Sequence, residues 1–171
     1  MRQVKGPSRI FVGVDVHQKS WSVDIIREDT HFKNFVMDPE PEQLLTYLKE
    51  HFPDDEALVG YEAGYCGFWI QREMESSGIQ CHVLHPSDIP STDKEKRRKN
   101  DRSDCRKIAK ALKNRAAESI HIPTLRNEAD RKLVRIRGRV LKRRNTIRCQ
   151  IKADLAQHGV KPPKEHEKGN W

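Results

Sequence analysis

The first part of the chain alternates short apolar runs with turns. Apolar and β-branched residues concentrate at 9–16, 20–27 and 31–37, and three mostly polar residues separate each run from the next. Runs of this length and composition predict β-strands, and connections this short join neighbouring strands as hairpins. We therefore expect the first 37 residues to form an antiparallel three-stranded meander.

Helical spacing begins after this meander. Pro39 and Pro41 precede leucines that recur every three or four residues, which is the pattern of an amphipathic helix. The pattern then predicts strands at 57–62 and 79–84, and helices at 68–77 and 101–114. The order β-β-β-α-β-α-β-α indicates an α/β protein with a mixed sheet and flanking helices, and the RNase H-like fold has this order.

Residues 127–158 follow a different rule. Arg and Lys fill most positions, while a narrow apolar stripe recurs at steps of three, four and seven: Leu133, Ile136, Val140, Ile147, Ile151 and Leu155. This predicts one long, basic amphipathic helix, whose stripe packs either on its own sheet or on another helix. We favour a coiled coil that makes a homo-oligomer through this helix, because the preceding domain already has a complete set of elements.

Charge divides the chain in a similar way. Residues 1–90 hold 8 Lys and Arg against 15 Asp and Glu, whereas residues 91–171 hold 25 against 10. Clustered basic residues bind nucleic acid by releasing counterions from its phosphates, so DNA or RNA is the expected partner; a solvated basic surface is the alternative. The candidate contacts lie in one loop and on the long helix: Lys94, Lys96, Arg97, Arg98, Lys99, Arg137, Arg139, Lys142, Arg143, Arg144 and Arg148.

Composition excludes several classes of protein. No apolar run approaches the roughly 18 residues that a membrane span needs, so we expect no membrane partner. The four cysteines are scattered and form no Cys-x-x-Cys pair, which argues against a zinc ribbon or a disulfide scaffold. The sequence opens without a secretion signal, so a cytoplasmic protein is expected.

Four carboxylates lie in or at the end of expected strands or at the start of an expected helix, where they could bind a metal ion. Asp15 interrupts the first apolar strand, Glu62 ends the fourth, and Asp101 and Asp104 lie three residues apart where a helix begins. If the fourth strand lies beside the first, Asp15 and Glu62 become neighbours, and a helix packed across them adds the other two. Four such charges converge only around a cation, and oxygen ligands select Mg²⁺ or Mn²⁺, ions that promote phosphodiester displacement. Taken alone, the helix pair could also be ordinary charge that the helix dipole favours.

Four motifs carry a family resemblance. They read VGVDVHQK at 12–19, YEAGYCGF at 61–68, HPSDIP at 85–90 and KNDRSDCRKIA at 99–109. In this order and spacing they resemble the DEDD transposases of bacterial insertion sequences, namely the "IS one-ten" family with its "IS eleven-eleven" branch and the related Piv invertase.

The resemblance implies a RuvC-like, RNase H-fold domain with Mg²⁺ or Mn²⁺ as its cofactor. Matched position by position, the catalytic and metal-binding residues are Asp15, Glu62, Asp101 and Asp104. The chain then divides into a RuvC-like DEDD domain at 1–124, a coiled-coil arm at 125–160 and a tail at 161–171 that starts a missing downstream region. DNA and a guide RNA are the implied partners, and the implied location is the bacterial nucleoid.

Two departures from the family qualify this expectation. Asn100 stands where the family usually has Thr, and both side chains can hydrogen-bond a neighbour. Family members also continue into a second domain that supplies a catalytic serine, whereas this sequence ends at Trp171. We therefore expect the N-terminal catalytic domain of a DNA transposase or recombinase, RNA-guided, that cleaves and exchanges DNA strands with Mg²⁺. The alternative is a truncated, catalytically incomplete module that only binds RNA or DNA.

Overall fold

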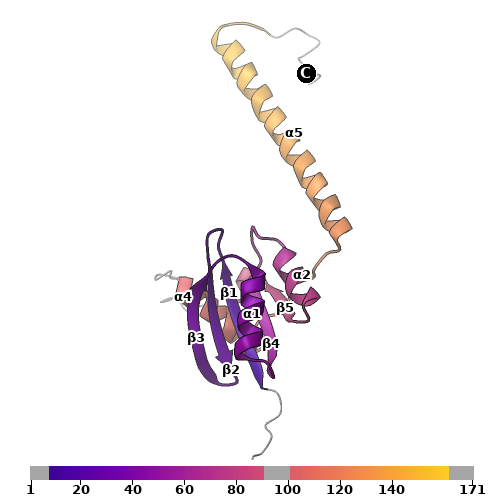
Figure 1. Cartoon of the computed structure of the whole chain (residues 1–171). Coiled ribbons are helices and arrows are strands. Elements are labelled where there is room, and N and C mark those ends of the chain that lie inside the picture. Colours follow the sequence, from indigo (N-terminus) through magenta and orange to yellow (C-terminus); the bar gives the residue numbers. More distant parts are fainter. Residues whose placement is uncertain (1–7, 91–100, 162–171) are drawn as a thin grey trace, which may run out of the picture. The chain divides into compact units, whose positions relative to one another are not determined.

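A five-stranded mixed sheet forms the centre of the first part of the chain (Figure 1). The computed structural model describes residues 8–90 and 101–161, except for the side chains of residues 101–103. The strand order is β3-β2-β1-β4-β5; the first three strands are antiparallel, whereas β4 and β5 run parallel to β1. The strands are β1 (Arg9–Val16), β2 (Trp21–Arg27), β3 (Thr30–Met37), β4 (Glu56–Glu62) and β5 (Gln80–Leu84). Each begins within one residue of its expected start, so the predicted strands are confirmed.

Helices cover both faces of this sheet. They are α1 (Pro41–His51), α2 (Trp69–Ser76) and α4 (Asp101–Lys113), with a short 3-10 helix η1 (Pro86–Asp88) after β5. Leucines of α1 and apolar residues of α2 share a core with Ile10, Val12 and Val14 of β1. The alternate side chain Phe11 instead packs with α4, on the opposite face. The observed architecture is the expected RNase H-like mixed sheet with flanking helices.

Two glycines let α4 lie directly on the sheet. Gly13 of β1 and Gly60 of β4 are register partners on the face that α4 covers. A Cβ atom at Gly13 would meet the carbonyl oxygen of Cys105 and lie 2.5 Å from the backbone nitrogen of Ala109. The helix backbone therefore touches β1 where a side chain would hold it away.

Residues 123–171 form a second unit, which contains the 33-residue helix α5 (Leu125–Gln157). The hydroxyl of Thr124 accepts a hydrogen bond from the backbone nitrogen of Asn127 at 3.2 Å and caps the helix. The helix therefore begins two residues before the expected 127–158 segment. No residue of α5 is buried in the described part of the chain, and Val140 and Ile147 of the apolar stripe are 59% and 54% exposed. No described helix, α5 included, is long and apolar enough to cross a membrane.

Candidate active site

The carboxyl ends of β1 and β4 bring two of the expected acids together. The two strands are parallel and hydrogen-bonded, with Val14 opposite Tyr61, so Asp15 and Glu62 follow at the same edge of the sheet. Side chains alternate along β1, and therefore Asp15 lies on the face of Gly13, which is the face that α4 covers. The expected pairing of the first and fourth strands is confirmed.

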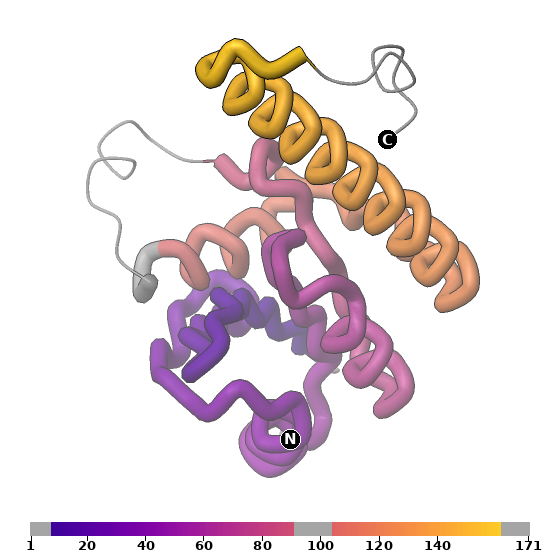
Figure 2. The backbone as a smooth tube through the Cα atoms, turned by 90° about the horizontal axis from the view of Figure 1, so that it is seen from above, coloured from indigo at the N-terminus to yellow at the C-terminus, as the bar shows by residue number. Residues whose placement is uncertain are grey.

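The helix α4 adds a third carboxylate. Its backbone rests on Gly13 through Cys105 and Ala109, which places the first turns of α4 beside the carboxyl end of β1. Figure 2 shows this salmon-coloured helix next to the indigo strands. Asp15, Glu62 and Asp104 line one cleft of about 360 Å³, which we call the acidic cleft; the loop after β4 completes its wall with Tyr65. Asp101 is the first residue of α4 and precedes Asp104 by three positions, which is one turn of the same helix face. The side chain of Asp101 lies outside the described part of the structure.

Two basic side chains lie against the carboxylates of the acidic cleft. The Nζ atom of Lys107 lies 2.8 Å from Oδ1 of Asp104, and only 14% of the Lys107 side chain is exposed. His17 Nε2 lies 3.1 Å from Oδ2 of Asp15. Neither residue was singled out from the sequence, although both lie inside the motifs. The spacing of Asp104 and Lys107, three residues apart on one helix, is the signal that could have found the pair.

The donor atoms of the acidic cleft fit a hard divalent ion. Asp15, Glu62 and Asp104 offer carboxylate oxygens, the ligand type that Mg²⁺ and Mn²⁺ prefer. Among the described side chains, no group of three His, Cys, Asp or Glu residues is gathered tightly enough to hold a metal ion. The structure therefore brings three of the four expected acids to one cleft.

A thiol and a phenol hydroxyl also line the cleft. Burial raises the pKa of the Cys66 thiol, so this sulfur stays protonated at neutral pH. The Tyr65 hydroxyl donates a hydrogen bond to the carbonyl oxygen of Val16 at 3.2 Å, which ties the loop after β4 to the end of β1. The carboxylates are therefore the candidate reactive groups of this cleft.

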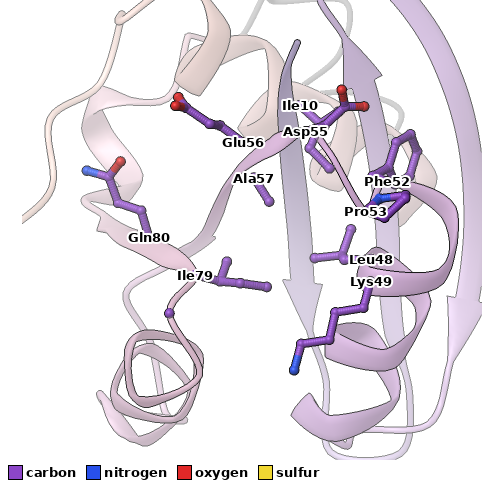
Figure 3. A pocket seen from close by; sticks show the side chains of 11 residues that line it. Ile10, Leu48, Lys49, Phe52, Pro53, Asp55, Glu56, Ala57, Ile79 and Gln80 are labelled. Atoms are coloured by element: carbon purple, nitrogen blue, oxygen red, sulfur yellow. The ribbon is translucent and has the colours of Figure 1, made fainter. Parts of the chain in front are cut away.

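A second hollow, of about 540 Å³, lies at the opposite end of the sheet (Figure 3). Leu48 of α1 and Ile79 point toward one another across it. Its carboxylates are engaged in ion pairs, since Asp55 lies 2.9 Å from Arg27 and Glu56 lies 3.2 Å from Arg9. This hollow has an apolar floor and paired charges at its rim, so the acidic cleft is the better candidate for catalysis.

The expected nucleic-acid contacts divide into two groups. Lys94, Lys96, Arg97, Arg98 and Lys99 lie outside the described residues. The others are on α5, where none forms an ion pair with another described residue: Arg137, Arg139, Lys142, Arg143, Arg144 and Arg148. All of these α5 residues except the half-buried Arg148 are exposed. They carry charge that no described neighbour neutralises, as a phosphate-binding surface requires.

The known protein sequences that this chain resembles are those of transposases. A family model described as a transposase, of the DEDD type named after IS110, matches residues 12–159. Transposase y4rJ of Sinorhizobium fredii is 32% identical over 116 residues, which cover 64% of this chain and 28% of that protein. The transposase for insertion sequence element IS1533 of Leptospira borgpetersenii is 29% identical over 139 residues, 75% of this chain and 38% of that protein. The chain thus spans well under half the length of these relatives.

Solved structures with a similar arrangement include Thermus thermophilus RuvC. Its structure aligns with a TM-score of 0.45 and 10% identity over 65% of this chain and 99% of that one. The same protein in complex with a Holliday junction substrate aligns with a TM-score of 0.42 and 9% identity over 66% and 99% of the two chains.

Proposed function

Because this chain belongs to the DEDD transposase family, we propose that residues 1–124 are the metal-binding catalytic domain of a DNA transposase that moves an insertion sequence. The observation that carries the proposal is the acidic cleft, where Asp15, Glu62 and Asp104 arrive from β1, β4 and α4. Residues so distant in sequence share a cleft only because the sheet pairs β1 with β4 and α4 lies across them. Cleavage and exchange of DNA strands is the reaction that such a site suits.

The residues of the cleft have distinct roles in this proposal. Asp15, Glu62, Asp101 and Asp104 would hold Mg²⁺ or Mn²⁺. When bound, such an ion stabilises the charge that develops on a phosphodiester during displacement. Lys107 neutralises Asp104 in the metal-free chain, and its ammonium group is released to face a phosphate oxygen when Asp104 takes another partner. The imidazole of His17 lies against the carboxylate of Asp15 and orients it toward the ion.

Nicking of supercoiled DNA separates this function from its alternative, a module that binds nucleic acid without chemistry. A catalytic domain should nick the DNA in the presence of Mn²⁺ and leave it intact in EDTA. If the chain binds DNA but leaves it intact under both conditions, the binding module is the better description.

The basic residues of α5 are proposed to bind DNA and a guide RNA through phosphates. Because they are distributed around the helix, about half of them can contact one duplex. Charge supports this role, because the six Arg and Lys residues at 137–148 have no acidic partner among the described residues. Replacing Arg143, Arg144 and Arg148 with Gln should flatten the log–log salt dependence of duplex binding by up to about 2–3 units, since each phosphate left without its cation lowers the slope by about 0.9. Fluorescence anisotropy across a salt series, with two unrelated oligonucleotides, measures this slope.

A control should remove the same charge elsewhere. Gln in place of the exposed Lys49, Lys110 and Arg115 of the first unit should leave the slope unchanged. Equal slopes for the α5 variant and the parent would reject the α5 surface. A loss of affinity that differed between the two oligonucleotides would mean that these arginines read bases, since phosphate contacts carry no base information.

The apolar stripe of α5 is proposed to pair protomers. All of its residues except the half-buried Leu155 are exposed in the described chain. Apolar residues that recur every three or four positions are buried when two such helices associate. Val140→Asp combined with Ile147→Asp should convert the oligomer to monomer, because two carboxylates then enter the seam. Sedimentation velocity measures the change.

The matched control places two charges on the opposite side of the same helix. Asn145→Asp with Cys149→Asp should leave the oligomer intact, since both positions are exposed and lie away from the stripe. A monomeric parent protein would contradict the pairing altogether.

A further inference from the structure

A fifth carboxylate is buried beside the acidic cleft. Asp24 in the middle of β2 has no exposed surface, and it is the register partner of Gly13, the residue on which α4 rests. It therefore lies on the face of Asp15, under the helix that carries Asp104. Its Oδ1 atom accepts hydrogen bonds from two side chains of β3, His31 Nε2 at 2.9 Å and Asn34 Nδ2 at 3.1 Å.

Burial of the other carboxylate oxygen of Asp24 destabilises the fold. Oδ2 is buried and has no hydrogen-bond partner among the described residues. A buried acceptor without a donor destabilises a fold by about 1–3 kcal/mol, and more when it carries charge. A carboxylate kept in such a place therefore needs an explanation beyond the stability of the sheet.

The hydrogen bonds of Asp24 connect it to α4 through Asn34. Asn34 Nδ2, which donates to Asp24, also lies 3.2 Å from the Sγ atom of Cys105. Cys105 is fully buried in α4 and follows Asp104 directly in the sequence. Asp24 thus fixes the amide of Asn34, and this amide contacts the turn of α4 that presents Asp104.

We infer that Asp24 is a positioning residue, which holds the first turns of α4 through Asn34 and Cys105 and so sets where Asp104 stands relative to Asp15. This inference rests on the proposed metal-binding function of the acidic cleft. Residues that orient metal ligands typically cost about 10–100-fold in metal affinity when they are replaced. Asp24 would act through its acceptor oxygen, so the charge itself is not required.

The test measures Mn²⁺ affinity by calorimetry and thermal stability by scanning calorimetry on the full chain. Asn34→Ala and Asp24→Ala should each raise the Mn²⁺ dissociation constant by about 10-fold. Asp24→Asn keeps an acceptor oxygen at the same place and should bind Mn²⁺ within about twofold of the parent. His31→Ala is the matched control: it removes the other donor to the same oxygen but makes no hydrogen bond to α4 among the described residues, so it should change stability alone.

The outcomes separate positioning from simple stabilisation. Asn34→Ala with parental Mn²⁺ affinity would overturn the inference, and so would equal weakening by His31→Ala. If Asp24→Ala fails to fold, Asn34→Ala still decides, because it leaves the buried carboxylate in place. If the parent binds no Mn²⁺, the proposed function fails on its own. Hydrogen exchange of the α4 amides from Cys105 onward then tests the positioning, with faster exchange expected in Asn34→Ala and unchanged exchange counting against it.

Discussion

Asp15→Asn and Asp104→Asn should each abolish Mn²⁺ binding, together with any Mn²⁺-dependent nicking of DNA. Each replaces a charged bidentate acceptor in the acidic cleft with an amide that offers one weaker ligand oxygen. Loss of an outer partner of a metal ligand costs about 10–100-fold in affinity, so loss of a ligand should exceed that range. Isothermal titration with Mn²⁺ measures the dissociation constant directly.

The control for this experiment is an acid far from the cleft. Asp54→Asn, at an exposed turn before β4, removes the same charge from the opposite end of the sheet and should bind Mn²⁺ like the parent. Thermal melting separates ligand loss from unfolding, because a variant that still unfolds cooperatively but binds no Mn²⁺ has lost a ligand and not its fold. Asp104→Asn should melt somewhat lower than the parent, since it leaves the largely buried Lys107 ammonium without its carboxylate. Parental Mn²⁺ affinity in both Asp15→Asn and Asp104→Asn would remove the acidic cleft as the metal site.

The strands and the cleft acids could be read from the sequence because their signals are local. The run at 9–16 is apolar, bounded by polar residues and interrupted by one acid, and that acid marks the end of β1. Glu62 likewise ends a short apolar run before glycines. The pairing of these two strands is less local: the meander leaves one side of β1 open, and the chain returns through α1 to add β4 there.

The polar network under α4 could not be read in this way. In residues 21–25, Trp21, Val23 and Ile25 alternate with Ser22 and Asp24, a pattern that is typical of a strand with one solvated face. The structure covers that second face with α4, and Asp24 is buried as a result. Helix placement depends on contacts between residues distant in sequence, so Asn34 and Cys105 give no signal until the fold brings them together.

Gly13→Ala should be the most damaging single-methyl change in the first unit. The added Cβ would lie against the backbone of α4 at Cys105 and Ala109, and backbone atoms cannot move aside as side chains do. Overpacking of this kind costs about 3 kcal/mol, which lowers the melting temperature by roughly 10 °C. Because α4 must lift from β1, Asp104 should also withdraw from Asp15, so Mn²⁺ affinity should fall along with stability.

Gly60 provides a graded control at the register partner of Gly13. A Cβ there would meet only the side chain of Leu112, with its nearest atom at 2.8 Å, and this flexible end can turn away. Gly60→Ala should therefore cost clearly less stability than Gly13→Ala, and Gly64→Ala, whose nearest contact is 3.8 Å, should cost least. Equal losses of melting temperature in all three variants would contradict a backbone contact at Gly13. If the losses follow the predicted order, the close approach of α4 to β1 determines both the stability of the fold and the geometry of the acidic cleft.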